Sequence, residues 1–263
     1  MSKILVVCDE KEPSVSLQQM PQSLKHLFVP APGHSFIGLD AGQAEVRVLA
    51  SLSQDKRMIE LFNSDRDIYK EMASMVYGVP YEDVTDDLRK KVKTCTIAIQ
   101  YQMGVPALAA RLGITESEAQ TVMDKYSSAF STAMSFRQNC LNYAMQTGKS
   151  PTFFGRYRDF GGADKMDSQK AGEAFSNLIQ GTQADLAKVA MVMVDKYFKE
   201  KGWGTIKIQL HDELLLEVPD ENLKEAEEAL PEIMKSSYKF RDDWCDFTFS
   251  AHSGKNWAEA SKD

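Results

Sequence analysis

Apolar residues recur with two different periods along this chain, and the change of period separates a short strand from a long helical region. Residues 36–39 form a compact apolar run that predicts a buried strand ending at Asp40. Residues 44–53, and the stretch from Asp55 to about Gly148, then carry apolar residues every three or four positions. This spacing predicts a mostly helical block after the strand.

Start and stop signals mark the ends of two helices in this block. Thr85 precedes two acidic residues, a pattern that predicts an N-cap followed by a first turn that favours negative charge. Thr115 and Glu118 have the spacing of a capping box, in which each side chain satisfies a backbone N–H group. The glycine at position 148 predicts the end of the helical block.

The rest of the chain returns to strands. A glycine-rich loop at 160–165 precedes a predicted helix, a hairpin, a second helix and a last strand, at 168–201, 205–210 with 214–219, 221–235 and about 246–254. The sequence shows no internal repeat. The order of strand, helical block, helix, hairpin, helix and strand predicts an α+β fold with a helical insertion.

Composition limits the class of protein. The 263 residues are 43% hydrophobic with a net charge of -7, which excludes disorder, collagen-like repeats and coiled-coil arrays. The four cysteines lie far apart without a CxxC pair, which argues against a zinc site or a disulfide framework. No leader cleavage site is recognisable, and no segment approaches the roughly 18 apolar residues of a membrane span. We therefore expect a cytoplasmic protein without membrane contact.

Carboxylates stand at the end of the first strand and at the turn of the hairpin. His211, Asp212 and Glu213 occupy that turn, where the strands cannot bury the two acids. If Asp212 lies beside Asp40 across a sheet, the pair could hold two Mg²⁺ ions about 3.5–4 Å apart for a phosphoryl transfer. Asp is also common in hairpin turns for backbone reasons alone, so both interpretations remain open.

A basic segment in the helical block offers a second candidate site. Residues 89–93 contain four cations in five positions, and local patches of this kind bind phosphate even in an acidic chain. A solvated helix face is the alternative interpretation. Arg89, Lys93, Ile97 and Tyr101 are spaced by four, so we expect them along one helix face.

The order of motifs resembles the polymerase domain of A-family DNA polymerases. DAGQAEVRVLASLS, RKKVKTCTIAIQYQMG and IQLHDELLLEV are similar to motifs A, B and C of that family. The flanking segments EPSVSLQQMP, HLFVPAPGHSFIGLD, FFGRYRDF, IQGTQADLAKVAM and SGKNWAEA also resemble the family's pattern. The matches follow the family's order and span about residues 12–260.

This resemblance implies a polymerase palm, an antiparallel sheet with helices, carrying an inserted helical fingers subdomain. We expect the palm at 1–58 and 156–263 and the fingers at 59–155. The match starts near the N-terminus, so the family's thumb and 3′–5′ exonuclease domains are expected to be absent. A second polypeptide is then expected to supply a thumb or proofreading, as in a split, phage-type enzyme acting in the host cytosol. A compact polymerase that works alone is the alternative.

The resemblance further implies a template-directed DNA polymerase for DNA replication, which joins dNTPs to the 3′-hydroxyl of template–primer DNA with two Mg²⁺ ions, or Mn²⁺ in their place. The implied metal ligands are Asp40, Asp212 and the backbone carbonyl of Ala41. The implied catalytic residues are Asp40, Asp212, Lys93 and Glu213. The implied dNTP-binding residues are Arg89, Lys93, Ile97, Tyr101, Glu45, Gln43 and Tyr69. The implied DNA-binding residues are Gln180, Gln209, His211 and Lys170.

The chain departs from the family pattern at several of these positions. Ile97 replaces an aromatic residue and Tyr69 a histidine, and near Gly172 and Ser176 the family's Arg and Asn for template–primer contacts are missing. We therefore expect activity with altered selectivity. A non-catalytic module that binds DNA or nucleotides in a larger replication assembly is the alternative function. A single-subunit RNA polymerase is a weaker alternative, against which Glu45 argues.

Overall fold

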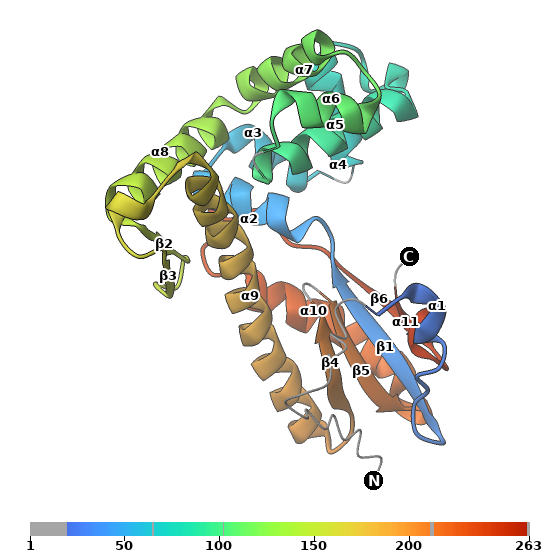
Figure 1. The fold of residues 1–263 in the computed structure, drawn as a ribbon. Helices are drawn as coiled ribbons and strands as arrows, with labels where there is room; N and C mark the ends of the chain where they lie inside the picture. The colour runs from blue at the N-terminus through green and yellow to red at the C-terminus, as the bar shows by residue number, and fades with distance from the viewer. Residues whose placement is uncertain (1–19, 65, 102, 211–212, 262–263) are drawn as a thin grey trace. The chain divides into compact units, whose positions relative to one another are not determined.

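The computed structural model describes residues 20–64, 66–101, 103–210 and 213–261 (Figure 1). These residues form two compact units. The first comprises the described parts of Met1–Gly42, Leu186–Lys239 and Phe247–Asp263, and the second those of Gln43–Asp185 and Phe240–Asp246. The limits of the units differ from the expected palm and fingers limits after residues 58 and 155, and the palm and fingers assignment stays a prediction.

The first unit is built on a four-stranded sheet in which all neighbouring strands are antiparallel (Figure 1). The strands lie in the order β4 (Thr205–Leu210), β5 (Glu213–Pro219), β1 (His34–Ala41) and β6 (Phe249–Gly254). Helices α10 (Leu223–Tyr238) and α11 (Trp257–Ala260) pack on the sheet, and α1 (Gln22–Lys25) packs on α11. The predicted α+β class with an antiparallel sheet is confirmed.

Strand β1 lies between β5 and β6, and its residues 35–39 are buried. Ile37 and Leu39 point to one face, whereas Phe36, Gly38 and Asp40 point to the other, as the two-residue period of a strand requires. The core on the second face consists of Phe36, Leu210, Leu215, Trp257 and Ala260. This core places Asp40 on the face of the sheet that α11 covers.

Gly38 allows the backbone of α11 to approach β1 closely. A Cβ atom at this position would lie 1.9 Å from the carbonyl oxygen of Ala260 and 3.3 Å from Oε1 of Glu213. Real side-chain atoms do not approach a backbone oxygen to 1.9 Å, so only glycine fits here. The small residue therefore fixes α11 against the strand that carries Asp40.

The second unit is mainly helical, as the sequence predicts. Its helices are α2 (Ala44–Ser53), α3 (Lys56–Phe62), α4 (Ile68–Tyr77), α5 (Asp86–Gln100), α6 (Val105–Leu112), α7 (Glu116–Ala129) and α8 (Ser131–Thr147). The hairpin β2 (Lys149–Pro151) and β3 (Tyr157–Asp159) follows, and α9 (Ser168–Lys201) contributes to both units. Single 3₁₀ turns lie at Tyr81–Asp83, Ala163–Lys165 and Asp220–Asn222. Across the described ranges, none of the helices combines the length and apolar character that crossing a membrane requires.

The helix signals in the sequence have the predicted geometry. Thr85 Oγ1 accepts a hydrogen bond from Leu88 N at 3.3 Å, which confirms the cap of α5. Thr115 and Glu118 form the predicted capping box of α7. Gly148 ends α8 in the left-handed conformation, with a φ of 66°.

Two buried charged side chains join the helices of the second unit. Asp55 caps α3 through Met58 N at 3.2 Å and accepts a hydrogen bond from Ala133 N, in α8, at 3.0 Å. Arg47 of α2 donates to the carbonyl oxygens of Phe62 and Asp246. Burial lowers the pKa of the Arg47 guanidinium, which stays far above neutral pH as an arginine does. The buried Arg47 guanidinium therefore stays charged, with backbone carbonyl oxygens as its hydrogen-bond acceptors.

Within the predicted helical block, α7 and α8 are separate helices that meet at the buried Phe130. One expectation from the sequence needs correction. Glu213 was expected at the exposed hairpin turn, but it is the first residue of β5 and is half-buried. Its strand position follows from pairing with both neighbours, Leu210 in β4 and Asp40 in β1.

Gly38→Ala is expected to lower the free energy of unfolding by about 1–3 kcal/mol, because the added methyl group must displace the Ala260 carbonyl. Urea unfolding followed by circular dichroism measures this change. Gly104→Ala is the matched control, since its Cβ would meet Pro106 Cδ at an ordinary 3.7 Å. Equal losses of stability in the two variants would contradict the requirement for glycine at position 38.

Candidate active site

The two ladders of β1 fix the position of Asp40 in the first unit. The register pairs Asp40 with Glu213 of β5 and with Ser250 of β6, and its side chain is half-buried. Ala41 is the last residue of the strand. The predicted metal ligand Asp212 immediately precedes Glu213 in the sequence, and both Asp212 and His211 lie outside the described residues.

The side chain of Glu213 already has a partner in the first unit. Its Oε1 accepts a hydrogen bond from Ser261 Oγ at 2.8 Å, just beyond the end of α11. Glu213 and Asp40 lie directly opposite each other and therefore on the same face of the sheet. Gln209, the other predicted residue of this unit that the structure describes, is exposed on β4 opposite Leu214.

In the second unit, α4 and α5 bring Tyr69, Arg89 and Lys93 together. The Arg89 guanidinium carbon lies 5.9 Å, and Lys93 Nζ 5.6 Å, from the centre of the buried Tyr69 ring. Both cations come from one face of α5, as their spacing of four residues predicts. A cavity of about 110 Å³ beside them is lined by Gln43, Tyr69 and Arg89 among other residues.

An acidic neighbour holds Arg89 within this cluster. Arg89 donates from Nε and Nη2 to Oδ2 of Asp67, at 2.9 and 2.8 Å. Burial acts to raise the pKa of Asp67, but hydrogen bonds from Arg89 and from Lys70 N bring it below the usual value. Burial raises the pKa of Tyr69 to about 12. At neutral pH the cluster therefore contains a charged Arg–Asp pair and a protonated tyrosine hydroxyl.

A second cluster joins Glu45, Tyr101 and Gln180, which belong to α2, the residue after α5, and α9. Tyr101 Oη donates to the two carboxylate oxygens of Glu45, at 2.9 and 3.1 Å. Gln180 Nε2 contacts Glu45 Oε1 at 3.2 Å and Tyr101 Oη at 2.8 Å. Three side chains expected at the nucleotide or DNA thus hold one another in place, although 135 residues separate Glu45 from Gln180.

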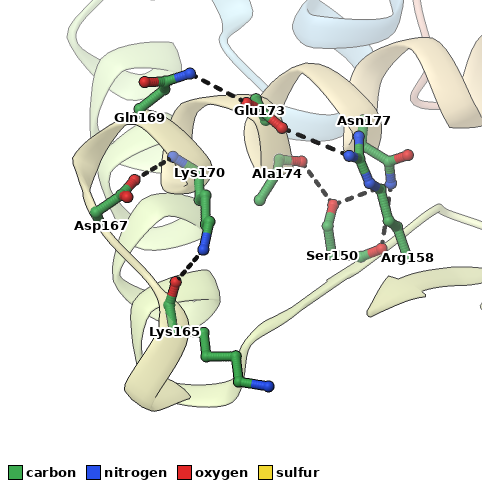
Figure 2. A network of polar contacts seen from close by, with 9 residues as sticks. All are labelled: Ser150, Arg158, Lys165, Asp167, Gln169, Lys170, Glu173, Ala174 and Asn177. Carbon is green, nitrogen blue, oxygen red and sulfur yellow. Dashed lines mark hydrogen bonds and ion pairs between the residues drawn. The ribbon is translucent and has the colours of Figure 1, made fainter. Parts of the chain in front are cut away.

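The remaining predicted residues of this unit have different surroundings. Ile97 is half-buried on α5 between Lys93 and Tyr101. Gln43 precedes α2 with a φ of 51°, a left-handed conformation that is uncommon for a residue with a side chain. Lys170, whose contact with DNA stays a prediction, donates from Nζ to the carbonyl oxygen of Lys165 at 2.5 Å (Figure 2).

The predicted metal ligands are all oxygen atoms, which is the donor set that Mg²⁺ prefers. Asp40 and the Ala41 carbonyl fit this chemistry, because they lie together at the end of a strand whose register two neighbours fix. Within the part of the chain that the structure describes, His, Cys, Asp and Glu side chains form no cluster of three able to hold a metal ion. The third predicted ligand, Asp212, is outside that part.

The sequence also matches a known protein family. The sequence model of DNA polymerase family A matches residues 13–259. This chain belongs to DNA polymerase family A. The predicted resemblance is therefore confirmed over nearly the whole sequence.

Individual family A proteins are similar over the same range. DNA polymerase I of Borreliella burgdorferi is 31% identical over 255 residues, which cover 93% of this chain and 28% of the relative. The thermostable DNA polymerase I of Thermus aquaticus is 34% identical over 233 residues, 85% of this chain and 28% of the relative. The chain thus spans less than a third of the length of these family members.

A solved structure of the family has the same fold. The POL domain of Pol1 from M. smegmatis, in complex with DNA primer-template and dNTP, superposes with a TM-score of 0.85 at 30% identity. The alignment covers 94% of this chain and 45% of that one. This similarity confirms the polymerase-domain fold that the motifs predict.

Sequence reasoning missed a clamp that holds the turn between β2 and β3 on α9. Asp185 accepts hydrogen bonds from Thr152 Oγ1 at 2.7 Å and from Arg156 Nε at 3.0 Å. Phe153 N donates to Thr182 Oγ1 at 3.0 Å. Gly181 is required beside them, because a Cβ there would lie 2.7 Å from Thr152 Cγ2. The motifs FFGRYRDF and IQGTQADLAKVAM contain most of these residues, but no local signal pairs them.

Asp185→Ala is expected to lower the free energy of unfolding by about 1–3 kcal/mol, because Thr152 and Arg156 lose their shared acceptor. Amide hydrogen exchange at residues 153–158 should accelerate. Asp195→Ala, which removes an exposed carboxylate of the same helix that pairs with Lys199, is the control. Unchanged exchange at 153–158 in the Asp185 variant would rule out the clamp.

Proposed function

We propose that this chain carries out template-directed DNA synthesis, joining a dNTP to the 3′-hydroxyl of a primer. Membership of DNA polymerase family A supports this proposal, as does the structural similarity to a POL domain whose structure includes primer-template and dNTP. The observation that carries it is the gathering of Tyr69, Arg89 and Lys93 around one another in the second unit. Two cations and a neutral hydroxyl donor suit the charge of a nucleotide triphosphate.

The ion pair at Arg89 suits a site that exchanges its anion. Arg89 and Asp67 are each 37% exposed, and exposed ion pairs contribute at most about 1 kcal/mol. A triphosphate carries more charge than one carboxylate and offers paired oxygens that match a guanidinium. We therefore infer that phosphate oxygens replace Asp67 as partners of Arg89, while Tyr69 supplies a hydrogen bond from its protonated hydroxyl.

The Glu45 cluster suits discrimination between sugars. Hydrogen bonds from Tyr101 and Gln180 restrict the carboxylate of Glu45 to one position. A side chain fixed in this way excludes a ribose 2′-hydroxyl more strictly than a mobile one, because it cannot rotate aside. We infer that Glu45 selects dNTPs over rNTPs, and that the missing aromatic ring at Ile97 alters the affinity for the base and sugar.

Asp40, Asp212 and the carbonyl of Ala41 would hold the two Mg²⁺ ions. When bound, such ions lower the pKa of the attacking hydroxyl and neutralise the triphosphate. The contribution of this chain is the fixed strand end that positions Asp40. Glu213 is proposed as an auxiliary acid near the primer. In this role its carboxylate would release the hydrogen bond from Ser261.

DNA-binding roles are proposed for Gln180, Gln209, His211 and Lys170. Gln180 on α9 and Gln209 on β4 are exposed, which supports this proposal because a DNA contact needs an accessible side chain. Lys170 would have to leave the carbonyl of Lys165 to reach a phosphate. A second polypeptide that supplies a thumb or proofreading stays a prediction of the sequence resemblance.

Asp40→Asn is expected to reduce template-directed primer extension by about a thousandfold or more, because a metal ligand loses its charge. EDTA should abolish extension by the unaltered chain, and excess Mg²⁺ should restore it. Asp124→Asn, an exposed carboxylate on α7, is the control and should retain activity. If the Asp40 variant keeps full activity and the native fold, the catalytic assignment is wrong. A chain that binds DNA but never extends a primer would favour the non-catalytic module.

Glu45→Ala is expected to raise the efficiency of rNTP use relative to dNTP use by about tenfold or more, because the fixed carboxylate no longer occupies the space of a 2′-hydroxyl. The ratio of kcat/KM for matched dNTP and rNTP substrates measures the effect. Glu60→Ala, at an exposed position on α3, is the matched control. An unchanged ratio in the Glu45 variant would exclude its role in sugar selection.

A further inference from the structure

An apolar pocket of about 350 Å³ opens at the surface of the second unit. Four elements enclose it, α2, α8, β2 and α9, which contribute Leu52, Phe136, Pro151 and Leu178 among other residues. None of the residues that line it in the described part of the chain belongs to the candidate metal, nucleotide or DNA sites. Its volume lies in the range of sites that bind small organic molecules.

The floor of this pocket consists of small residues. Ala144 of α8, Ala174 of α9 and Ser150 of β2 are buried. Ser150 Oγ donates to the carbonyl oxygen of Ala174 at 2.6 Å and accepts a hydrogen bond from Asn177 Nδ2 at 3.2 Å (Figure 2). These contacts hold β2 against α9 and occupy the Ser150 hydroxyl. The floor therefore favours an apolar group over a polar one.

The walls of the pocket are apolar and partly aromatic. Phe136, Cys140 and Leu178 are half-buried along them. Burial raises the pKa of the Cys140 thiol to about 11, so at neutral pH the thiol is uncharged and acts as a small apolar group. Phe136 and Tyr143 both present a ring to the pocket, and aromatic rings pack well against other rings.

Lys149 of β2 is the one charged side chain among the described lining residues. It is exposed, so it lies at the mouth, and its Nζ is 5.0 Å from the centre of the Tyr157 ring. Asp159 lies opposite Lys149 in the β2–β3 pair, but Asp159 Oδ1 accepts a hydrogen bond from Gly161 N at 2.8 Å. An ammonium group has three N–H donors and the ring covers one side of it, so an anion at the mouth can still bind Lys149.

We propose that this pocket binds a small organic anion, a molecule with an apolar ring system and one carboxylate or sulfonate group. The rings fill the space between Phe136, Cys140 and Leu178, and the anionic group meets Lys149. Burial of the rings supplies most of the affinity, and the exposed charge adds a smaller, salt-dependent part. The pocket is separate from the candidate active site, so this inference does not depend on the proposed function.

Two dyes with the same rings test the assignment on the full chain. Anilinonaphthalene sulfonate carries an anionic group and phenylnaphthylamine lacks it, and the fluorescence of both rises in an apolar site. Lys149→Gln is expected to weaken binding of the sulfonate about threefold to tenfold at low salt and to leave the neutral dye unaffected. Lys125→Gln is the matched control, because it removes another exposed lysine that lies over a tyrosine ring, that of Tyr77.

Cys140 locates the bound dye. Cys140→Trp places a ring inside the pocket and is expected to weaken binding of both dyes by about tenfold or more. Circular dichroism checks that this variant keeps the native fold. In the unaltered chain, excess phenylnaphthylamine should slow the alkylation of Cys140 by N-ethylmaleimide, which mass spectrometry of the Cys140 peptide measures.

Equal affinity for the sulfonate in the Lys149 and Lys125 variants would overturn the proposed anion, as would loss of the neutral dye with Lys149→Gln. If Cys140→Trp folds and binds both dyes as before, or if the dye leaves Cys140 alkylation unchanged, the assignment to this pocket is overturned. An unaltered chain that binds neither dye would overturn the proposal as a whole. A dimer in sedimentation velocity that Cys140→Trp dissociates would then identify a second copy of the chain as the occupant.

Discussion

The register of β1 between β5 and β6 is the constraint on which the first unit depends. A strand alternates its side chains, so a slip of one residue would turn Asp40 to the face of Ile37 and Leu39. Two hydrogen-bonded ladders oppose that slip, and the absence of a side chain at Gly38 allows α11 to pack in one position only. The position of Asp40, the predicted metal ligand, is therefore fixed by the pairing and packing of the residues around it.

In the second unit, a single long helix organises groups that lie far apart in the sequence. Three nearby residues of α9 make different contacts. Gln180 joins the Glu45 cluster, Gly181 leaves space for the side chain of Thr152, and Asp185 holds the turn between β2 and β3. The hairpin held in this way carries Lys149. The segment IQGTQADLAKVAM thus supplies a polar contact in the Glu45 cluster and also holds the turn between β2 and β3. Gly181 stands inside the helix because a side chain there would collide with Thr152.

Features that depend on local chemistry could be predicted from the sequence. Thr85 and Thr115 cap their helices as predicted, because a cap involves only the next three residues. The hairpin of β4 and β5 and the helix at 168–201 could likewise be predicted, from the spacing of their hydrophobic residues. The partners of Glu213 and Lys170 could not be predicted, because Ser261 is brought in by tertiary packing and Lys165 by the fold of a loop. The motif resemblance supplied the family, which periodicity alone does not.

The guanidinium proposed to meet the triphosphate, that of Arg89, is held by the exposed carboxylate of Asp67. Such pairs keep an arginine extended toward its site, yet they are weak enough for a more highly charged phosphate to displace the carboxylate. The chain has a net charge of -7, so the proposed triphosphate site depends on local cations and not on the overall charge. We propose that the phosphate reaches an arginine that is already positioned for it.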